Sequence, residues 1–285
     1  MYIKILLKIL IIIFLIIIII YIHNNYMKYG YIFAIGGGNN VDKKIFKKMY
    51  ELSNNNNVLI ITDASTNTKS NHLEKTLKWF NQFKNIKPTI KNIKLKDTKT
   101  ITVLKEYINN SGIIYFTGGH QIDLLNSIQY INKNFNTSFR NILINFLNNG
   151  GILSGTSAGA SIIGYKMPTG EIISKRRIPI YIKNNNLIKV DDNKYYIKKS
   201  LNLVPFLIDQ HFTENNRHTR GISTAIDNKL KIVGIDENTG FYIKYGSIKL
   251  NKIGPNNITI YDARNINIKK KDNLFIVSNL KVNTF

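Results

Sequence analysis

The chain has 285 residues, enough to bury a sizeable core in one large domain or two small ones. Its 40 Lys and Arg against 17 Asp and Glu give a formal net charge of +23. The lysines are scattered among asparagines and isoleucines without a long basic run, so nucleic-acid binding is not expected. Cysteine is absent, which excludes disulfides, thiolate metal sites and a cysteine nucleophile.

The chain opens with a hydrophobic segment. Residues 9–22 are uncharged, and residues 5–22 give the roughly eighteen positions that a span requires if Lys8 snorkels to the interface. No small-residue cleavage site follows, so an uncleaved signal anchor is favoured over a cleaved signal peptide. Lysines before the segment predict that the rest of the chain lies outside the cytoplasm, anchored to the membrane or, after cleavage, secreted. Residues 1–30 are predicted as anchor and spacer, and residues 31–285 as one globular domain.

From residue 31 onward, short apolar runs alternate with helical stretches. Strands are predicted near residues 31–35, 57–65, 89–95, 112–119 and 152–156, and helices near 70–80, 121–128 and 139–147. Buried β-branched strands separated by helices are typical of a mainly parallel sheet with helices on both faces. The fold class predicted is therefore a three-layer α/β/α sandwich.

The last third of the chain follows a different pattern. Residues 165–199 are rich in isoleucine and asparagine and predict excursion loops or a hairpin. From residue 231 to the end, short strands such as "KIVGID" and "GFYIKYG" alternate with turns. We expect these strands as antiparallel additions at a sheet edge.

The stretch "GGILSGTSAGASIIG", residues 150–164, combines a short apolar strand, a turn of small residues and the start of a helix. The turn contains G-x-S-x-G, the pattern of a nucleophile elbow, with Ser157 at its centre. The alternative is an ordinary small-residue connection between a strand and a helix.

Two further glycine turns follow predicted strands. Residues 36–38 fail the dinucleotide-binding pattern G-x-G-x-x-G because Val41 stands at the last glycine position, so no nucleotide cofactor is expected. "FTGGHQ", residues 116–121, places two glycines between a strand and a helix. Its Gly119 N–H and the N–H of Ala158 are the predicted donors to a developing oxyanion, with a plain turn as the alternative.

A serine nucleophile needs a base, and the base needs an orienting acid. His211 lies in "DQHF" after an apolar run, and "GIDENTG" places Asp236 and Glu237 after another strand. The two carboxylates are either turn formers or the acid of a catalytic triad. An α/β-hydrolase order would instead require Asp191 or Asp192, which lie in a lysine-rich loop with no strand before them.

Four motifs occur in order between residues 31 and about 246: "FTGGHQ", "GTSAGA", "DQHF" with following arginines, and "GIDE" with a threonine. Together they resemble the cyanophycinase branch of the S51 serine peptidases. The resemblance implies a fold like that of class I glutamine amidotransferases, with serine in place of the nucleophilic cysteine. It implies Ser157 as nucleophile, His211 as base and Glu237 as its acid, within a catalytic domain that requires no metal or cofactor.

The resemblance also implies a substrate. Cyanophycinases release β-Asp-Arg dipeptides from cyanophycin, which is multi-L-arginyl-poly-L-aspartate. The positions that match the family's substrate pocket are Gln121, Asp209, Gln210, Arg217 and Arg220. Asp209 has an alternative role, in bracing the "DQHF" turn. Two departures, His120 and Asn215, fall in the predicted pocket and leave the preferred leaving group open.

Several alternatives remain at this stage. Related S51 members cleave Asp-X dipeptides, so the protein is expected to act on cyanophycin or on aspartyl dipeptides, β-linked ones included. More distant alternatives are an α/β-hydrolase esterase and a membrane-tethered binding protein that kept the fold without catalysis. The expected partners are a peptide substrate and, through residues 5–22, a membrane. A homodimer is left open.

Overall fold

A computed structural model of the protein describes residues 9–18, 29–65, 71–176, 180–183, 187–190, 192–271 and 274–285. Residues 9–18 are helical and carry exposed apolar side chains. Within these described ranges, no helix has both the length and the apolar character needed to cross a membrane. The predicted anchor, residues 5–22, extends past the described helix at both ends and stays a prediction.

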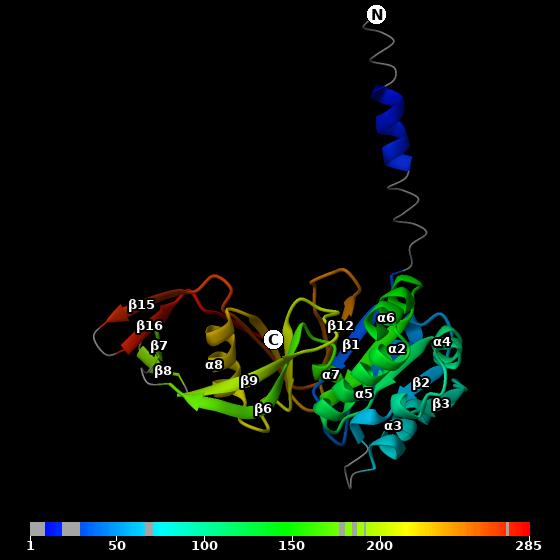
Figure 1. Ribbon diagram of the computed structural model, residues 1–285, viewed down its shortest axis with the longest axis horizontal. Helices are drawn as coiled ribbons and strands as arrows, with labels where there is room; N and C mark the ends of the chain where they lie inside the picture. The colour runs from blue at the N-terminus through cyan, green and yellow to red at the C-terminus, as the bar shows by residue number, and fades with distance from the viewer. Residues whose placement is uncertain are drawn as a thin grey trace, which may run out of the picture.

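A seven-stranded sheet forms the centre of the larger lobe (Figure 1). Its order is β13-β12-β1-β5-β4-β2-β3. The parallel strands are β1 (Tyr31–Ile35), β2 (Val58–Ile61), β3 (Ile90–Ile93), β4 (Ile113–Phe116) and β5 (Ile152–Thr156). β12 (Gly240–Lys244) and β13 (Asn251–Ile253) add to the edge antiparallel. The mainly parallel core was therefore predicted correctly.

Helices cover both faces of this sheet. On one face lie α2 (Lys43–Leu52) and α3 (His72–Asn81); on the other lie α4 (Ile101–Asn109), α5 (Gln121–Asn134), α6 (Phe139–Asn148) and the short α7 (Ala158–Ser161). Two 3-10 turns, Asp63–Ser65 and Leu95–Asp97, follow β2 and β3. In β1, Phe33 and Ile35 pack toward α2, whereas Ile32 and Ala34 pack into the opposite cluster. This alternation confirms the three-layer α/β/α sandwich.

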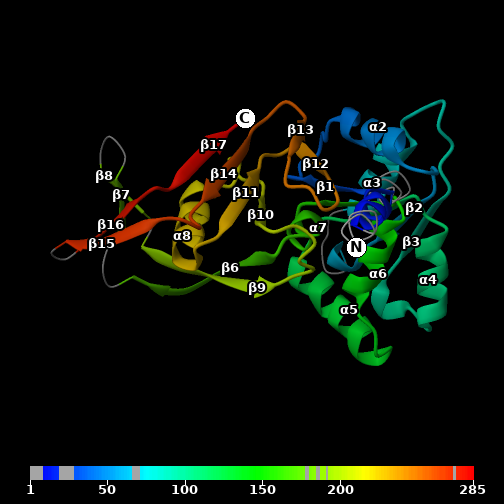
Figure 2. The same cartoon turned by 90° about the horizontal axis from the view of Figure 1, so that it is seen from above.

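The second lobe is built from strands and one helix (Figure 2). β6 (Lys166–Lys175) pairs antiparallel with β9 (Asn193–Lys199), as a hairpin in residues 165–199 would, but two further strands lie between them in the chain. One four-stranded sheet contains β10 (Leu207–Gln210), β11 (Lys231–Ile235), β14 (Ile258–Asp262) and β17 (Lys281–Thr284), and α8 (His218–Asn228) packs on it. Another contains β7 (Ile180–Lys183), β8 (Leu187–Lys189), β15 (Asn267–Lys271) and β16 (Leu274–Ser278).

The late strands depart in part from the prediction of edge additions. β12 and β13 do extend the central sheet, but β11, β14 and β16 lie in the two further sheets. The reason is that β11 pairs parallel with β10, with helix α8 as the connection between the two strands. This pair starts a new sheet instead of extending the central one.

The close approach of β4, β5 and α7 explains the small residues around Ser157. A Cβ added to Gly155 would lie 2.1 Å from the carbonyl oxygen of Gly159, and one added to Gly159 would lie 2.3 Å from that of Phe116. Both contacts are with backbone atoms, which cannot swing aside. Glycine at these positions lets α7 begin directly at the carboxyl end of β5, where ligands gather in α/β folds.

Candidate active site

Ser157 has the backbone conformation of a sharp elbow between β5 and α7. Its φ is 51° and its ψ is −115°, a backbone conformation that residues other than glycine rarely adopt. The Ser157 N–H donates to the carbonyl oxygen of Ile35 at 2.9 Å, and its own carbonyl accepts from Ala160 and Ser161. These bonds hold a conformation that costs about 1–3 kcal/mol, and such strain is concentrated at functional sites.

His211 connects the serine to a carboxylate. Its Nε2 lies 2.8 Å from Ser157 Oγ, and its Nδ1 lies 2.6 Å from Glu237 Oε1. An ionised carboxylate accepts hydrogen bonds only, so Nδ1 carries the proton and Nε2 is left to accept from the serine hydroxyl. Ser157, His211 and Glu237 thus form one continuous hydrogen-bonded relay, which brings together the three residues that the sequence placed in these roles.

The glycine turn after β1, Gly36 to Gly38, determines where the relay lies. Gly37 has φ +107°, and a Cβ there would lie 2.3 Å from Cε1 of His211. The backbone N–H of His211 donates to the carbonyl oxygen of Gly36 at 2.9 Å, and that of Asn238 donates to Gly37 at 2.8 Å. In the sequence, this turn was considered only as a cofactor-binding motif. The glycine run at the carboxyl end of the first strand was the signal that could have indicated its place beside the catalytic residues.

The structure distinguishes between the neighbouring acids. Asp236 is buried, and its two carboxylate oxygens accept from the backbone N–H groups of Thr213 and Asn257 at 3.0 and 3.1 Å. Its carboxylate braces two loops, while that of Glu237 is directed at His211. Of the alternative acids, Asp192 pairs with Lys189 at the surface, and Asp191 lies outside the described residues.

A cavity of about 140 Å³ opens beside the relay. The Gly37–Asn39 turn, Thr156 and Gly118 form part of its wall, and His72, Lys75 and Trp79 of α3 form another part. A Cβ on Gly118 would lie 3.3 Å from Cβ of Ser157, whereas Gly119, with φ +131°, faces the carbonyl oxygen of Ala64. Ala158 is the first residue of α7. The oxyanion roles of Gly119 and Ala158 stay predictions.

A family model for peptidase family S51 matches residues 32–251, well over half of the chain. The chain belongs to peptidase family S51. Two solved structures share its fold, each with 17% sequence identity. One is a peptidase from an acI-B1 Actinobacterium, with a TM-score of 0.58 over 92% of this chain and 100% of the other. The second is a peptidase E-like protein from Listeria monocytogenes EGD-e, with a TM-score of 0.52 over 80% of this chain and 100% of the other.

Membership of the family confirms the resemblance to the S51 serine peptidases seen in the sequence, and the protein is a serine-type peptidase. At 17% identity, the two structures are evidence for the fold alone, which they share with this chain over most of its length. Neither tests the choice between cyanophycin and dipeptides as substrates.

The residues predicted to bind substrate in this S51 peptidase lie largely against one another. Arg220 binds both oxygens of the buried Asp209 carboxylate, and Arg217 Nη1 lies 3.3 Å from the same carboxylate and 3.1 Å from Gln210 Oε1. Burial lowers the pKa of the Arg217 guanidinium, and the charge of Asp209 opposes that shift. Gln121 Nε2 donates to the carbonyl oxygen of Pro168 at 2.8 Å. Contact of these side chains with a substrate stays a prediction.

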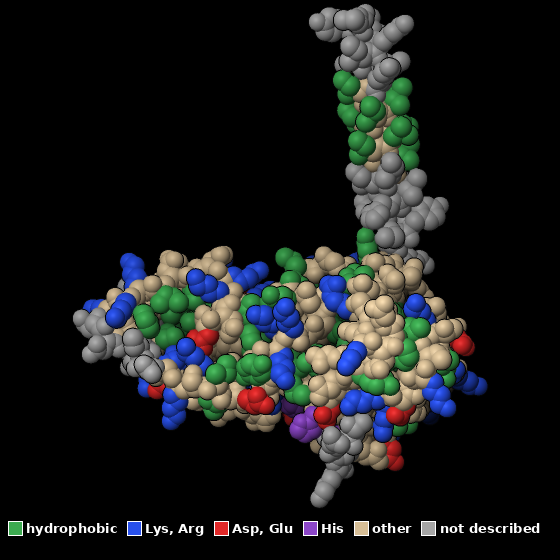
Figure 3. Space-filling view, in the orientation of Figure 1, with side chains coloured by type: hydrophobic (Ala, Val, Ile, Leu, Met, Phe, Trp, Pro, Cys, Tyr) green, Lys and Arg blue, Asp and Glu red, His purple; other side chains and the backbone are tan. Residues whose placement is uncertain are grey.

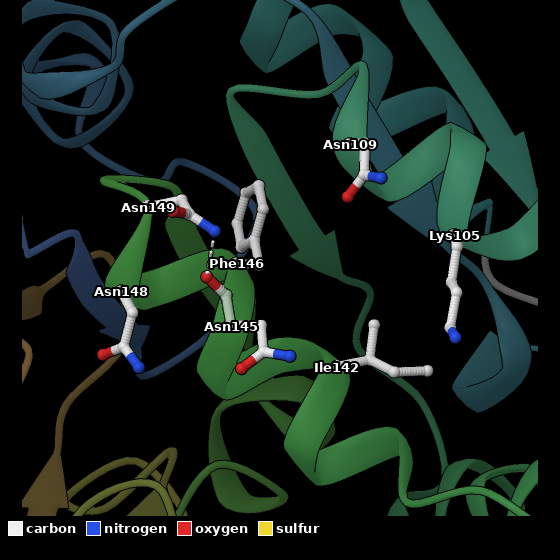
Figure 4. A pocket seen from close by; sticks show the side chains of 7 residues that line it. All are labelled: Lys105, Asn109, Ile142, Asn145, Phe146, Asn148 and Asn149. Atoms are coloured by element: carbon white, nitrogen blue, oxygen red, sulfur yellow. Dashed lines mark hydrogen bonds between the residues drawn. The ribbon is translucent and has the colours of Figure 1, made fainter.

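A larger cavity of the peptidase, about 500 Å³, lies between α4 and α6 (Figure 4). Four asparagines, Phe146 and Ile142 line it together with Lys105, and Asn149 donates to the carbonyl oxygen of Asn145 there. No hydroxyl, imidazole or carboxylate side chain is among the residues that line it. This cavity is therefore not a candidate active site in place of the relay.

On the face shown in Figure 3, the positive charge of the described residues forms no single patch. Lysine and arginine side chains are spread over the face seen in Figure 3, between apolar and uncharged polar ones. This distribution matches the scatter of lysines along the sequence and does not form the basic stripe typical of nucleic-acid binding.

His72 provides a prediction about pH. Burial lowers its pKa below the ordinary value of 6.5, and the charges of Lys75 and His211 lower it further. Below that ordinary value the unfolded chain binds this proton more readily than the folded one, so the free energy of unfolding falls as the pH falls. The melting temperature, measured by thermal denaturation, should therefore fall less between about pH 7.5 and about pH 5 in His72→Asn than in the wild type.

The control is Asn81→Ala, which removes an exposed side chain without a titrating group at the end of α3 and should keep the wild-type slope. Identical slopes for His72→Asn and the wild type would contradict the prediction.

Proposed function

We propose that the peptidase hydrolyses the peptide bond on the carboxyl side of an aspartyl residue through an acyl-enzyme on Ser157. Cyanophycin is the substrate we favour, and Asp-X dipeptides are the alternative. The observation that carries the proposal is the relay from Ser157 through His211 to Glu237, with distances of 2.8 and 2.6 Å, at the edge of a cavity.

The chemistry follows from the relay. His211 Nε2 takes the hydroxyl proton as Ser157 Oγ attacks the peptide carbonyl, and Glu237 stabilises the imidazolium that forms. The oxyanion of the tetrahedral intermediate accepts from the N–H groups of Gly119 and Ala158, its proposed donors. Collapse of the intermediate expels the amine, which receives the proton from His211. Water, activated by the same imidazole, then hydrolyses the ester and frees the serine.

The preference for cyanophycin rests on the "DQHF" motif with its arginines. The side chains of Arg217 and Arg220 share one carboxylate, that of Asp209, so the cluster retains one net positive charge. Both arginine side chains are partly exposed, at 20% for Arg217 and 15% for Arg220. A positive cluster beside His211 supports attraction of the free carboxylate of a β-Asp-Arg unit. The contacts of Asp209 itself favour its alternative role as a brace for the "DQHF" turn.

The assignment of the acid is tested by two neighbouring substitutions. Glu237→Gln should lower kcat by about 10⁴-fold, because a neutral amide neither fixes the tautomer of His211 nor stabilises the imidazolium. Asp236→Asn should instead lower the free energy of unfolding by about 1–3 kcal/mol, since an amide NH₂ would face a backbone N–H that now donates to a carboxylate. Steady-state kinetics and thermal denaturation of both variants separate the two effects. A larger loss of kcat in Asp236→Asn than in Glu237→Gln would overturn the assignment.

The substrate is tested by incubating the full-length protein with cyanophycin, with β-Asp-Arg and with α-Asp-X dipeptides, and identifying the products by mass. Release of β-Asp-Arg from the polymer is the expected result, and Ser157→Ala is the control that should abolish it. Cleavage of α-Asp-X dipeptides alone would replace cyanophycinase activity by aspartyl dipeptidase activity. Hydrolysis by Ser157→Ala at the wild-type rate would contradict the mechanism for either substrate.

A further inference from the structure

A cavity of about 770 Å³ lies within the second lobe of the peptidase. Its lining residues come from β6, β7, β9, β15, β16 and α8, and none of them lines the cavity beside the relay. Cavities of roughly 300–1,000 Å³ commonly hold small molecules. The hydrolysis at Ser157 makes no use of this second-lobe cavity, so its lining must be considered for a role of its own.

The floor of the second-lobe cavity is apolar. Ile226 of α8 and Ile180 of β7 are buried there, and Phe275 of β16 is the register partner of Ile180. Ile268 of β15 continues this apolar surface outward and is 43% exposed. In Figure 3, apolar side chains gather over this end of the second lobe, with lysine and arginine side chains around them. An apolar chain lying on this floor would remove these side chains from water, which is favourable.

Three lysines surround the apolar floor. Lys175 of β6, Lys194 of β9 and Lys229 at the end of α8 all line the cavity and are exposed. Lys194 stands opposite Ser174 in the β6–β9 pair, and both residues line the cavity. Among the residues that the structure describes, none of these three lysines has an ion pair. Their ammonium groups are therefore available to an anion at the entrance.

The one carboxylate among the described lining residues, that of Asp227, is already paired. Arg176 Nη2 lies 2.5 Å from Asp227 Oδ2 and donates to Ser223 Oγ at 2.6 Å. The Arg176 side chain is only 3% exposed, so this pair is part of the wall. It neutralises the carboxylate and leaves the charge of the three lysines uncompensated.

We propose that the second-lobe cavity binds an amphipathic carboxylate, a fatty acid in its simplest form. The alkyl chain lies on Ile180, Ile226 and Phe275, and the carboxylate lies among the lysines at the entrance. An apolar floor with a cationic rim is complementary to such a molecule, because the charged end stays near water while the chain is buried. The proposal is independent of the substrate and of the mechanism at Ser157.

The test measures binding of decanoate to the full-length protein by isothermal titration calorimetry, below the micelle concentration. The wild type should bind decanoate more tightly than butyrate, which lacks the long chain, and more tightly than 1-decanol, which lacks the charge. The double variant Lys194→Gln/Lys229→Gln should bind decanoate about 5- to 20-fold more weakly, because two ion pairs are lost. Its affinity for 1-decanol should equal that of the wild type.

The matched control is Lys199→Gln/Lys269→Gln, which removes the same charge from β9 and β15 at exposed positions that do not line the cavity. It should bind decanoate as the wild type does. Equal weakening in the two double variants would overturn the proposal, because it would show attraction to the basic chain in general. Equal affinities of the wild type for decanoate and butyrate would also overturn it.

The position of the ligand is tested with a photoreactive decanoate and peptide mass spectrometry. Cross-links to β6, α8 or β16 are the expected result. The apolar helix at residues 9–18 is the competing position, since its side chains are exposed. Cross-links confined to that helix would overturn the assignment of the cavity.

Discussion

The imidazole of His211 lies against the backbone of Gly37, and the rest of the active site depends on that contact. Three segments from distant parts of the chain are tied to the end of β1. Ser157 donates to Ile35, His211 donates to Gly36, and Asn238, next to Glu237, donates to Gly37. The nucleophile, the base and the acid are thus positioned through backbone hydrogen bonds to consecutive residues, and a side chain at Gly37 would occupy the place of the imidazole.

Around this contact, the acidic residues divide into those that brace loops and the one that takes part in the relay. The carboxylate of Asp209 is surrounded by Arg217 and Arg220, and that of Asp236 accepts from two backbone N–H groups. Because these carboxylates are buried, loss of their partners would leave unpaired charge at high cost. They hold the loops that carry His211 and Glu237, and the carboxylate of Glu237 stays available for the base.

Much of this arrangement was predictable from the sequence, because it depends on local pattern and order. The alternation of apolar runs and helices gives the parallel sheet, and G-x-S-x-G at the end of a strand gives the elbow at Ser157. The position of His211 after one strand and of Glu237 after another gives the order of the relay. Positions 155 and 159 require glycine because a Cβ at either position would collide with backbone atoms of a neighbouring element.

The features that could not be predicted from the sequence depend on contacts between residues that are distant in the chain. Spacing in the chain does not say that Asp209 pairs with the arginines after "DQHF", nor that the carboxylate of Asp236, and not that of Glu237, binds two loops. The sequence predicts a helix near residues 70–80, but the fold of the sheet decides that α3 lines the cavity beside the relay. For the same reason, the pairing of β11 with β10 in a separate sheet was not foreseen.

The most direct test of this account is the rate at which a serine-directed fluorophosphonate labels Ser157 in Gly37→Ala, compared with the wild type and with Gly246→Ala. Both glycines have positive φ, +107° and +84°, but a Cβ at Gly246 would have no neighbour within 4 Å. The account predicts that Gly37→Ala, folded by circular dichroism, is labelled far more slowly than the other two proteins. A folded Gly37→Ala that is labelled at the wild-type rate would contradict it.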